Sequence, residues 1–559
     1  MELKKHIQTF CIQENCTIID AMKVINEADE RACFMVDKDM CLIRVFTDGD
    51  IRRALLKGAQ TSDPIRDIHS RQPFVVKEGN SLDDARQYLS KRLSVVPIVN
   101  QKNQVQGLVR IHDVEPFLNI KSREVMILGM GYVGLTLALI LADRGFLVHG
   151  FDVNEELIEK LKNKELPFYE RGMDKYLSKL VGHGLRLTTS LHESRADVYI
   201  ITVGTPIDKS TMRPRDEFIR KAAKTIGGIL KNNDLVILRS TVPVGLTRTT
   251  VLPILEEESS LKAGEEFYLA YCPERTAEGR ALKELRENPQ IIGGIDSHSI
   301  ELASRLFNAN THTVVDVGSL EAAEMCKLLD NTYRDTIFAY ANQMAMLCEK
   351  EGLDLNELTS KVNLSYGRNV IPKPSPGVGG ACLSKDPYIL MQNFERHGLS
   401  TTFIQEGRRI NESAPRWIYE RSEKLLSSLD KDIAQARVFI IGFAFKGSPE
   451  TSDLRESTTL WFLDELHIKG VSDIWGYDAI VDDNQLENLG VNSCSLEEGF
   501  KDADAVFIMN NHRSYADIKL FQLIDTMNKP ALFYDGWNTF DPADIKNIPG
   551  ITYAGVGVG

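Results

Sequence analysis

The chain has 559 residues, which is too long for a single ordinary core and predicts three or four domains. Hydrophobic residues make up 43% and charged residues 26% of the sequence, as in soluble globular proteins. The formal net charge of −13 argues against nucleic acid as a partner, because binding to the phosphate backbone needs clustered cations.

The nine cysteines include no CxxC pair and are odd in number, which predicts neither a metal site nor a full disulfide set. The N-terminal residues lack an apolar stretch of signal-peptide length, so we expect a cytoplasmic protein. The most apolar run, residues 125–142, contains three glycines and ends at Asp143-Arg144. We therefore expect a buried strand, turn and helix there, and no membrane span.

Residues 1–122 contain an internal repeat. The segments ACFMVDKDMCLIRVFTDGDIRRAL and SVVPIVNQKNQVQGLVRIHDVEPFL each show an apolar strand, a polar turn, a second strand and an Asp that opens a helix. Helical stretches with apolar residues at i, i+3 and i+4 precede both segments. The repeat predicts a separate α+β module in which Asp50 and Asp113 occupy equivalent places.

From residue 123 the pattern changes to strands that alternate with amphipathic helices, which is typical of a parallel sheet covered on both faces. We expect strands at 125–128, 147–151, 198–203, 235–239 and 267–270 in a domain spanning 123–318. Residues 319–430 are predicted to be mostly helical, with a Pro/Gly break at 372–380. A second set of strands is expected within 431–559, at 437–442, 474–477, 505–509, 531–534 and 551–554. The predicted fold is α/β: two Rossmann-like, doubly wound domains joined by a helical connector, plus the N-terminal module.

The first strand of that part leads into Gly129-x-Gly131-x-x-Gly134 at the start of a helix. The three glycines allow a tight turn, close approach of a pyrophosphate and tight packing of helix on strand. The helix N-terminus offers free N–H groups to the phosphates. Asp152 follows the second strand, where a carboxylate accepts ribose hydroxyls and repels a 2′-phosphate. The pattern predicts an NAD site; the alternative is a Gly-rich turn of an unrelated α/β fold.

Seven further segments have no obvious structural need for their composition: LPFYERGM (166–173), ITVGTP (201–206), RSTVPVG (239–245), YCPERTAEG (271–279), EMCKLLDNTY (324–333), PSPGVGGACLSKDP (374–387) and GFAFKGSPETSDLRES (442–457). With these motifs in order, residues 124–559 resemble the UDP-glucose/GDP-mannose dehydrogenase family of nucleotide-sugar 6-dehydrogenases. The resemblance implies oxidation of the C6 alcohol of a UDP-sugar to a carboxylate with two NAD. The CPER and PSPGVGG spellings look closest to UDP-N-acetylhexosamine dehydrogenases, whereas Leu383-Ser384 and Trp537 depart from UDP-glucose enzymes and leave the sugar open.

The chemistry of that reaction fits the residues present. A thiolate that adds to the intermediate aldehyde gives a thiohemiacetal, whose oxidation leaves a thioester for water to hydrolyse. Cys382 lies in a Gly-rich turn and is the expected nucleophile, while Cys33, Cys326 and Cys348 are interpreted as buried structural thiols. Lys327 and Asn331, spaced i and i+4, can stabilise an oxyanion together. The resemblance assigns proton transfer to Glu274; Asp386 could position water or pair with Lys327, which would alternatively be a plain structural ion pair.

The resemblance also assigns ligand contacts. Its cofactor residues are Gly129, Gly131, Tyr132, Val133, Gly134, Asp152, Thr205, Thr241, Lys385 and Arg455. Its substrate residues are Glu274, Lys327, Arg368, Gly379 and Lys446. Relatives supply the arginine at the position of Arg368 to a neighbouring subunit, which implies a homo-oligomer of at least two chains.

The N-terminal repeat resembles a tandem pair of CBS domains, modules that often bind adenine nucleotides. The family holds the ribose with a Thr or Ser three residues before an Asp, as in Thr47 and Asp50. The second repeat has Arg110 before Asp113, so the two sites are not equivalent. The implied partner is an adenine-nucleotide effector; the alternative is a dimerisation module without a ligand.

Two other functions compete with the leading one. A two-electron hydroxy-acid dehydrogenase would need neither Cys382 nor a second nucleotide domain. A catalytically silent nucleotide-sugar sensor would not need the full set of expected catalytic residues, Cys382, Lys327, Asn331, Glu274 and Asp386.

Overall fold

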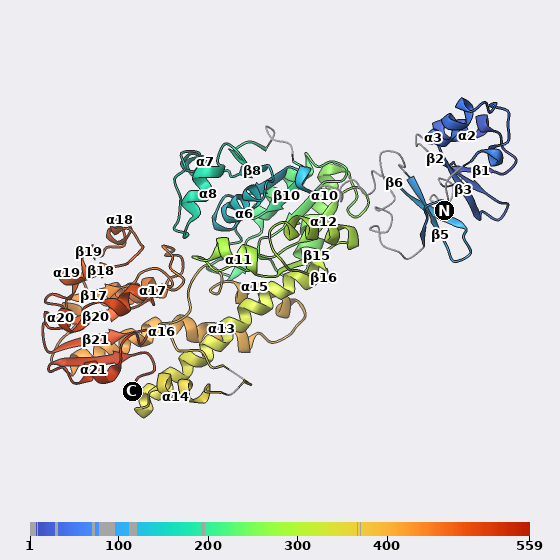
Figure 1. Ribbon diagram of the computed structural model, residues 1–559. Helices are drawn as coiled ribbons and strands as arrows, with labels where there is room; N and C mark the ends of the chain where they lie inside the picture. The colour runs from blue at the N-terminus through green and yellow to red at the C-terminus, as the bar shows by residue number, and fades with distance from the viewer. Residues whose placement is uncertain are drawn as a thin grey trace. The chain divides into compact units, whose positions relative to one another are not determined.

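The computed structural model describes residues 7, 9–27, 32–69, 73–77, 95–110, 120–191, 196–365, 367–368 and 370–559. The chain divides into two compact units, residues 1–120 and 121–559 (Figure 1). No helix within the described residues is long and apolar enough to cross a membrane.

The N-terminal unit consists of two small sheets with the same topology. In the first sheet, β1 (Cys11–Gln13) runs parallel to β2 (Ala32–Val36), which pairs antiparallel with β3 (Leu42–Thr47). In the second, β4 (Val76–Lys77), β5 (Val95–Val99) and β6 (Val105–Arg110) repeat that order. Helices α2 (Ile18–Glu27) and α3 (Asp48–Leu56) belong to the first repeat. Side chains of both repeats, including Phe34, Val45, Val95 and Val99, share one core, so the repeats fold together.

The first α/β domain is built on an eight-stranded sheet. Its strand order is β9 (Leu185–Thr188), β8 (Val148–Phe151), β7 (Val125–Leu128), β10 (Val198–Ile201), β13 (Leu235–Leu238), β14 (Tyr268–Tyr271), β15 (Gln290–Gly294) and β16 (Val314–Ser319). The strands β9 to β14 are parallel, and β15 runs antiparallel to β14. The order of strands reverses at β7 and β10, and such a switch point is where doubly wound sheets bind ligands.

The helices of this domain are α6 (Tyr132–Asp143), α7 (Glu155–Lys162), α8 (Met173–Leu180), α9 (Glu217–Gly227), α10 (Leu252–Ser259), α11 (Ala281–Glu287) and α12 (Ser297–Asn308). Helix α6 is buried along most of its length, which explains why residues 125–142 are so apolar. The expectation of a buried strand and helix in that run is therefore correct.

The second α/β domain repeats the arrangement with a fully parallel six-stranded sheet. The order is β19 (Asn492–Ser493), β18 (Ile474–Tyr477), β17 (Val438–Ile441), β20 (Ala505–Ile508), β21 (Ala531–Asp535) and β22 (Ile551–Gly555). Its helices are α17 (Thr458–Ile468), α18 (Asp483–Glu487), α19 (Leu496–Phe500), α20 (Leu520–Ile524) and α21 (Pro542–Lys546). These two sheets and the helical segment between them confirm the predicted fold class.

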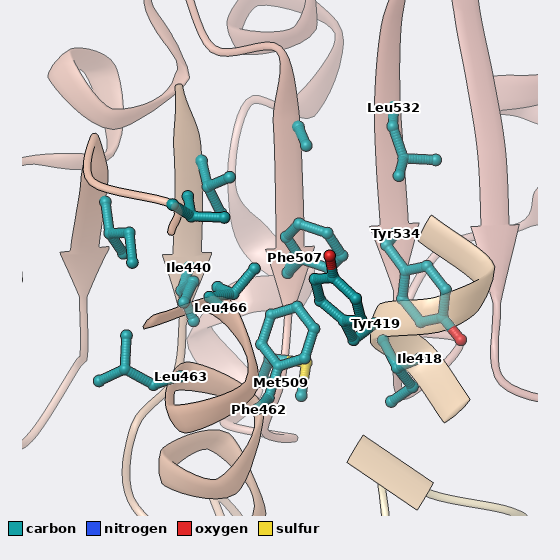
Figure 2. Close-up of a cluster of buried hydrophobic side chains, with 14 of the residues drawn as sticks. Ile418, Tyr419, Ile440, Phe462, Leu463, Leu466, Phe507, Met509, Leu532 and Tyr534 are labelled. Atoms are coloured by element: carbon teal, nitrogen blue, oxygen red, sulfur yellow. The ribbon is translucent and has the colours of Figure 1, made fainter. Parts of the chain in front are cut away.

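The connector consists of α13 (Leu320–Glu351), α14 (Leu355–Val362), α15 (Asp386–Arg396) and α16 (Thr402–Ser427). Its last helix also belongs to the core of the second domain. Figure 2 shows Ile418 and Tyr419 of α16 beside Phe462 of α17 and Phe507 of β20, and all four side chains are buried. Because one helix is shared in this way, the connector and the second domain form one packed body.

Polar side chains buried between α13 and α16 hold the loop that precedes Cys382. Arg408 donates to Asp335 at 2.6 Å and to the carbonyl of Val378 at 3.3 Å. Asn411 donates to the Asp335 carboxylate at 2.8 Å. Burial raises the pKa of Asp335, while the Arg408 guanidinium opposes that rise. The pair therefore fixes both the helix packing and residues 374–380.

Removing the cation of this buried pair should destabilise the connector. We expect Arg408→Met to lower the free energy of unfolding by about 3–5 kcal/mol, because Asp335 is left buried without its counter-charge. The matched control is Arg409→Met, whose exposed side chain pairs with Glu406 and should change stability by less than about 0.5 kcal/mol. Chemical denaturation of both variants checks this; equal stability of the two would contradict the role of Asp335 and Arg408.

Candidate active site

The cofactor loop between β7 and α6 has the geometry that a pyrophosphate requires. A Cβ on Gly134 would lie 1.8 Å from the carbonyl oxygen of Gly129, so only glycine lets the helix close on the strand. Gly129 has a φ of +100°, in the left-handed region that favours glycine. Gly131 faces open space and begins the helix, which leaves room and free N–H groups for an anion. The residues present fit NAD.

Asp152 follows β8 and is tied to the same loop. Its carboxylate accepts a hydrogen bond from the backbone N–H of Met130 at 2.7 Å and another from Asn154 at 2.9 Å. A carboxylate has about four acceptor positions, so it can still accept ribose hydroxyls. Tyr132 and Val133, the first two residues of α6, are half-buried, and the Tyr132 hydroxyl donates to Glu170.

Three other predicted cofactor residues meet at a single point. The ammonium group of Lys385 donates to the hydroxyl of Thr205 at 3.1 Å, and that hydroxyl donates to the carbonyl of Thr241 at 2.9 Å. Lys385 precedes α15 in sequence, whereas Thr205 and Thr241 follow β10 and β13. The connector thus places a cation against the ends of the strands of the first domain.

Around Cys382 the structure brings together residues from α13 and from the start of α15. Asn331 donates to the buried carboxylate of Asp386 at 2.5 Å. Lys385 lies 3.7 Å from the other oxygen of that carboxylate. Among the described residues these two side chains are the partners of the Asp386 carboxylate, and no ion pair joins Asp386 to Lys327 in this structure. Lys327, which is also buried, remains available for another role.

Cys382 is exposed to solvent, yet protein atoms surround its thiol closely enough that desolvation raises its pKa. The ammonium groups of Lys327 and Lys385 act in the opposite direction and favour the thiolate. Asp386 and Glu278 add to the rise. The reactivity of the thiol therefore depends on the balance between these charges.

Glu274 is buried and bound by Arg239, which lies in the RSTVPVG segment but was not predicted as a site residue. Arg239 donates to the Glu274 carboxylate at 2.5 Å and to the Cys272 carbonyl at 3.0 Å. The backbone N–H of Thr276 donates to the second carboxylate oxygen at 2.5 Å. Burial alone would raise the pKa of Glu274, but Arg239, Thr276 and Lys327 together hold it below its ordinary value. The carboxylate is therefore ionised near neutral pH.

The second α/β domain reaches the same loop through Lys446 and Arg455. Lys446 donates to the backbone carbonyl of Glu278 at 2.8 Å, and Arg455 lies 3.3 Å from the Glu278 carboxylate. Burial and the nearby Asp453 raise the pKa of Glu278 to about 7. Desolvation lowers the pKa of Lys446. Glu278 was not predicted as a site residue, although it lies in the YCPERTAEG segment that was singled out.

Two of the predicted substrate residues, Gly379 and Arg368, form no hydrogen bond or ion pair with the cluster around Cys382 among the residues that the structure describes. A Cβ on Gly379 would lie 2.0 Å from the carbonyl oxygen of Glu456, so close chain approach already requires glycine there. Arg368 is exposed, and no hydrogen bond or ion pair within the described part of the chain connects it to the site.

In the N-terminal unit, Thr47 and Asp50 form a capping box at the start of α3. The Asp50 carboxylate accepts from the Thr47 hydroxyl at 2.7 Å and from Arg53. Asp113 lies outside the described residues, and Arg110 packs over the ring of Phe10.

Comparison with known proteins identifies the family. The chain matches the NAD binding domain of the UDP-glucose/GDP-mannose dehydrogenase family over residues 123–311, its central domain over 321–413 and its UDP binding domain over 439–542. Residues 65–117 match a CBS domain. The chain therefore belongs to the UDP-glucose/GDP-mannose dehydrogenase family. It is an NAD-dependent dehydrogenase with an additional CBS-containing unit at its N-terminus.

The similar proteins include several dehydrogenases of N-acetylated sugars. A UDP-N-acetyl-D-mannosamine dehydrogenase of Campylobacter jejuni is 32% identical over 71% of this chain and 97% of its own length. An NDP-N-acetyl-D-galactosaminuronic acid dehydrogenase of Ralstonia solanacearum is 30% identical over 71% of this chain and 93% of its own. The solved structure of a UDP-D-ManNAc dehydrogenase from Pyrococcus horikoshii superposes with a TM-score of 0.71 at 30% identity, covering 78% of this chain and 99% of that one.

The position of Asp152 predicts the choice of cofactor. Asp152→Ala should weaken NAD binding by roughly ten- to a hundredfold, because hydrogen bonds to a charged group contribute about 1.5–3 kcal/mol. It should also narrow the preference for NAD over NADP, because the repulsion of a 2′-phosphate is removed. Asp152→Asn, which keeps an acceptor but not the charge, should accept NADP with a smaller loss for NAD. Steady-state kinetics with both cofactors test this; wild-type enzyme that uses NADP as well as NAD would contradict it.

Proposed function

We propose that the protein oxidises the C6 alcohol of a UDP-N-acetylhexosamine to the uronic acid in two successive oxidations, with UDP-glucose as the alternative substrate. The observation that supports this most is the cluster around Cys382, in which Lys327 and Asn331 come from α13 and Asp386 comes from α15. The names of the relatives support an N-acetylated sugar. When bound, NAD accepts the hydride in each oxidation.

The thiol of Cys382 acts between the two oxidations. Its thiolate adds to the C6 carbon of the aldehyde, and the carbonyl oxygen takes up the charge. Lys327 is buried beside this thiol without an ion pair among the described residues, so its ammonium can stabilise that oxygen. The amide of Asn331 uses one N–H for Asp386 and has a second N–H to donate.

Hydrolysis of the thioester requires a base that takes a proton from the attacking water. Glu274 is held ionised by Arg239, so its carboxylate can take a proton from water as the water attacks the thioester carbon. The C–S bond breaks, and its electron pair leaves with sulfur as the thiolate of Cys382. The carboxylic acid that forms loses its remaining proton to solvent, and Glu274 also passes its proton to solvent, so the sugar leaves as a carboxylate. The Asp386 oxygen without a hydrogen-bond donor is a buried acceptor that can orient the substrate hydroxyl.

We also propose that the protein is a homo-oligomer assembled through α13. Leu329, Tyr333, Tyr340 and Leu347 are each more than half exposed. Their spacings of four, seven and seven residues place them along one face of that helix. A second copy of the chain would cover this apolar stripe, and Arg368 would contribute to the neighbouring site.

A further proposal is that the N-terminal unit binds an adenine nucleotide and regulates the dehydrogenase. The match to a CBS domain and the repeated topology support it. Thr47 and Asp50 form a capping box, so their spacing can be explained by helix capping without a ligand. The alternative of a dimerisation module without ligand therefore stays open.

The count of NADH per sugar tests the reaction. We expect two NADH from one of UDP-N-acetylmannosamine, UDP-N-acetylgalactosamine, UDP-N-acetylglucosamine or UDP-glucose. One NADH would indicate a two-electron dehydrogenase, and none with any UDP- or GDP-sugar would indicate a sensor.

Cys382→Ser should reduce steady-state turnover by at least about a thousandfold while NAD still binds, because an oxygen ester hydrolyses slowly. The control Cys326→Ser, next to Lys327, should turn over normally; normal turnover of the Cys382 variant would contradict the thioester.

Removal of the N-terminal unit tests the regulatory proposal. AMP, ADP or ATP should raise the melting temperature of the full chain but not that of residues 121–559. The same nucleotide should change activity by a few-fold to about a hundredfold, which corresponds to roughly 1–3 kcal/mol of coupling. If nucleotides have no effect and only the oligomeric state changes, the unit is a dimerisation module.

A further inference from the structure

A cleft of about 630 Å³ lies between the two α/β domains and is lined by none of the residues assigned above to catalysis, cofactor or substrate. One wall comes from the first domain, at the start of α8 and along α11. The other wall comes from the second domain, at residues 447–450 and Arg513. The volume falls within the range of about 300–1,000 Å³ that is typical of small-molecule sites.

The charge of this cleft is opposite to that of the chain as a whole. Five of its lining side chains are cationic and three are acidic, in a protein of net charge −13. The three carboxylates already have partners. Glu170 accepts from the backbone N–H groups of Gly279 at 2.6 Å and Ala281 at 3.0 Å, and Glu450 accepts from the Tyr169 hydroxyl at 2.5 Å. Glu287 lies 3.7 Å from Lys283.

Of the four arginines that line the cleft, one is paired with a carboxylate and three are not paired with any residue that the structure describes. Arg286 pairs with Asp143 at 3.2 Å and bonds the Tyr176 hydroxyl. Arg171, Arg280 and Arg513 are exposed, and none of them forms an ion pair with any residue that the structure describes. They come from three separate segments, so local sequence does not account for their gathering. Like charges held around one cavity repel, and an anion in the cavity removes that cost.

We propose that this cleft binds a phosphate-bearing small molecule with at least two negative charges, of the size of a nucleoside diphosphate or triphosphate. Guanidinium groups bind phosphate oxygens through paired, charge-assisted hydrogen bonds. Arg171 and Arg280 belong to the first domain and Arg513 to the second. The ligand therefore contacts both domains and favours the arrangement in which the three arginines face one another.

The test measures binding rather than turnover, so its result does not depend on the proposed reaction. Inorganic pyrophosphate is titrated calorimetrically into the full chain in the presence of saturating NAD and UDP. We expect one pyrophosphate per chain to bind under these conditions. The variant R280Q/R513Q should bind it at least about tenfold more weakly, because two charge-assisted contacts are lost. The controls R409Q and R416Q remove exposed, ion-paired arginines of α16 and should bind as the wild type does.

Two results would overturn the proposal. In the first, R280Q/R513Q binds pyrophosphate as tightly as the wild type, which would place the anion elsewhere, including the N-terminal unit. In the second, NAD and UDP abolish the binding, which would place the anion in the cofactor or nucleotide-sugar site. The single variants R171Q and R513Q change exposed side chains on opposite walls and should each weaken binding several-fold. They keep the test decisive if the double variant fails to fold.

Discussion

The buried ion pair between Arg239 and Glu274 fixes the loop on which the rest of the site depends. That loop, residues 272–280, links β14 to α11 and receives contacts from three directions. Arg239 holds its start, Glu170 accepts the N–H of Gly279 near its end, and Lys446 of the second domain donates to the adjacent carbonyl of Glu278. Glu170 also accepts from Tyr132 in the cofactor loop. A displacement of this loop would therefore move the cofactor site, the proposed base and the contact between the domains together.

The charged groups of the site are costly to bury, and the structure offsets that cost in different ways. Glu274 accepts hydrogen bonds from Arg239 and Thr276, so its pKa falls despite burial. For Cys382, the cations Lys327 and Lys385 are opposed by Asp386 and Glu278 as well as by desolvation, so its pKa rises. Burial and the nearby carboxylate of Asp453 raise the pKa of Glu278. Neighbouring groups of this site thus differ in the direction in which their pKa values are shifted.

The sequence predicts much of this fold because its strongest signals are local. Strand β7 lies where the apolar run and the spacing of the glycines predict it, and β18 has the predicted bounds. The contacts that assemble the site are not local: Arg239 and Glu274 are separated by 35 residues, and Asn331 and Asp386 by 55. Periodicity carries no information about such pairs. The resemblance named the segments, but it did not show that Asp386 pairs with Asn331 instead of Lys327.

The N-terminal unit shows a second limit of prediction from sequence, because one local pattern can serve two purposes. Thr47 and Asp50 match the spacing of a ribose-binding pair, and the same spacing defines a capping box, in which each side chain bonds the backbone of the other. The fold uses the capping arrangement, and Arg53 occupies the remaining carboxylate oxygen. A ligand at this position would have to compete with Arg53 or accept hydrogen bonds alongside it. The motif therefore indicates where a nucleotide could bind, whereas the energy to bind it must come from other residues of the unit.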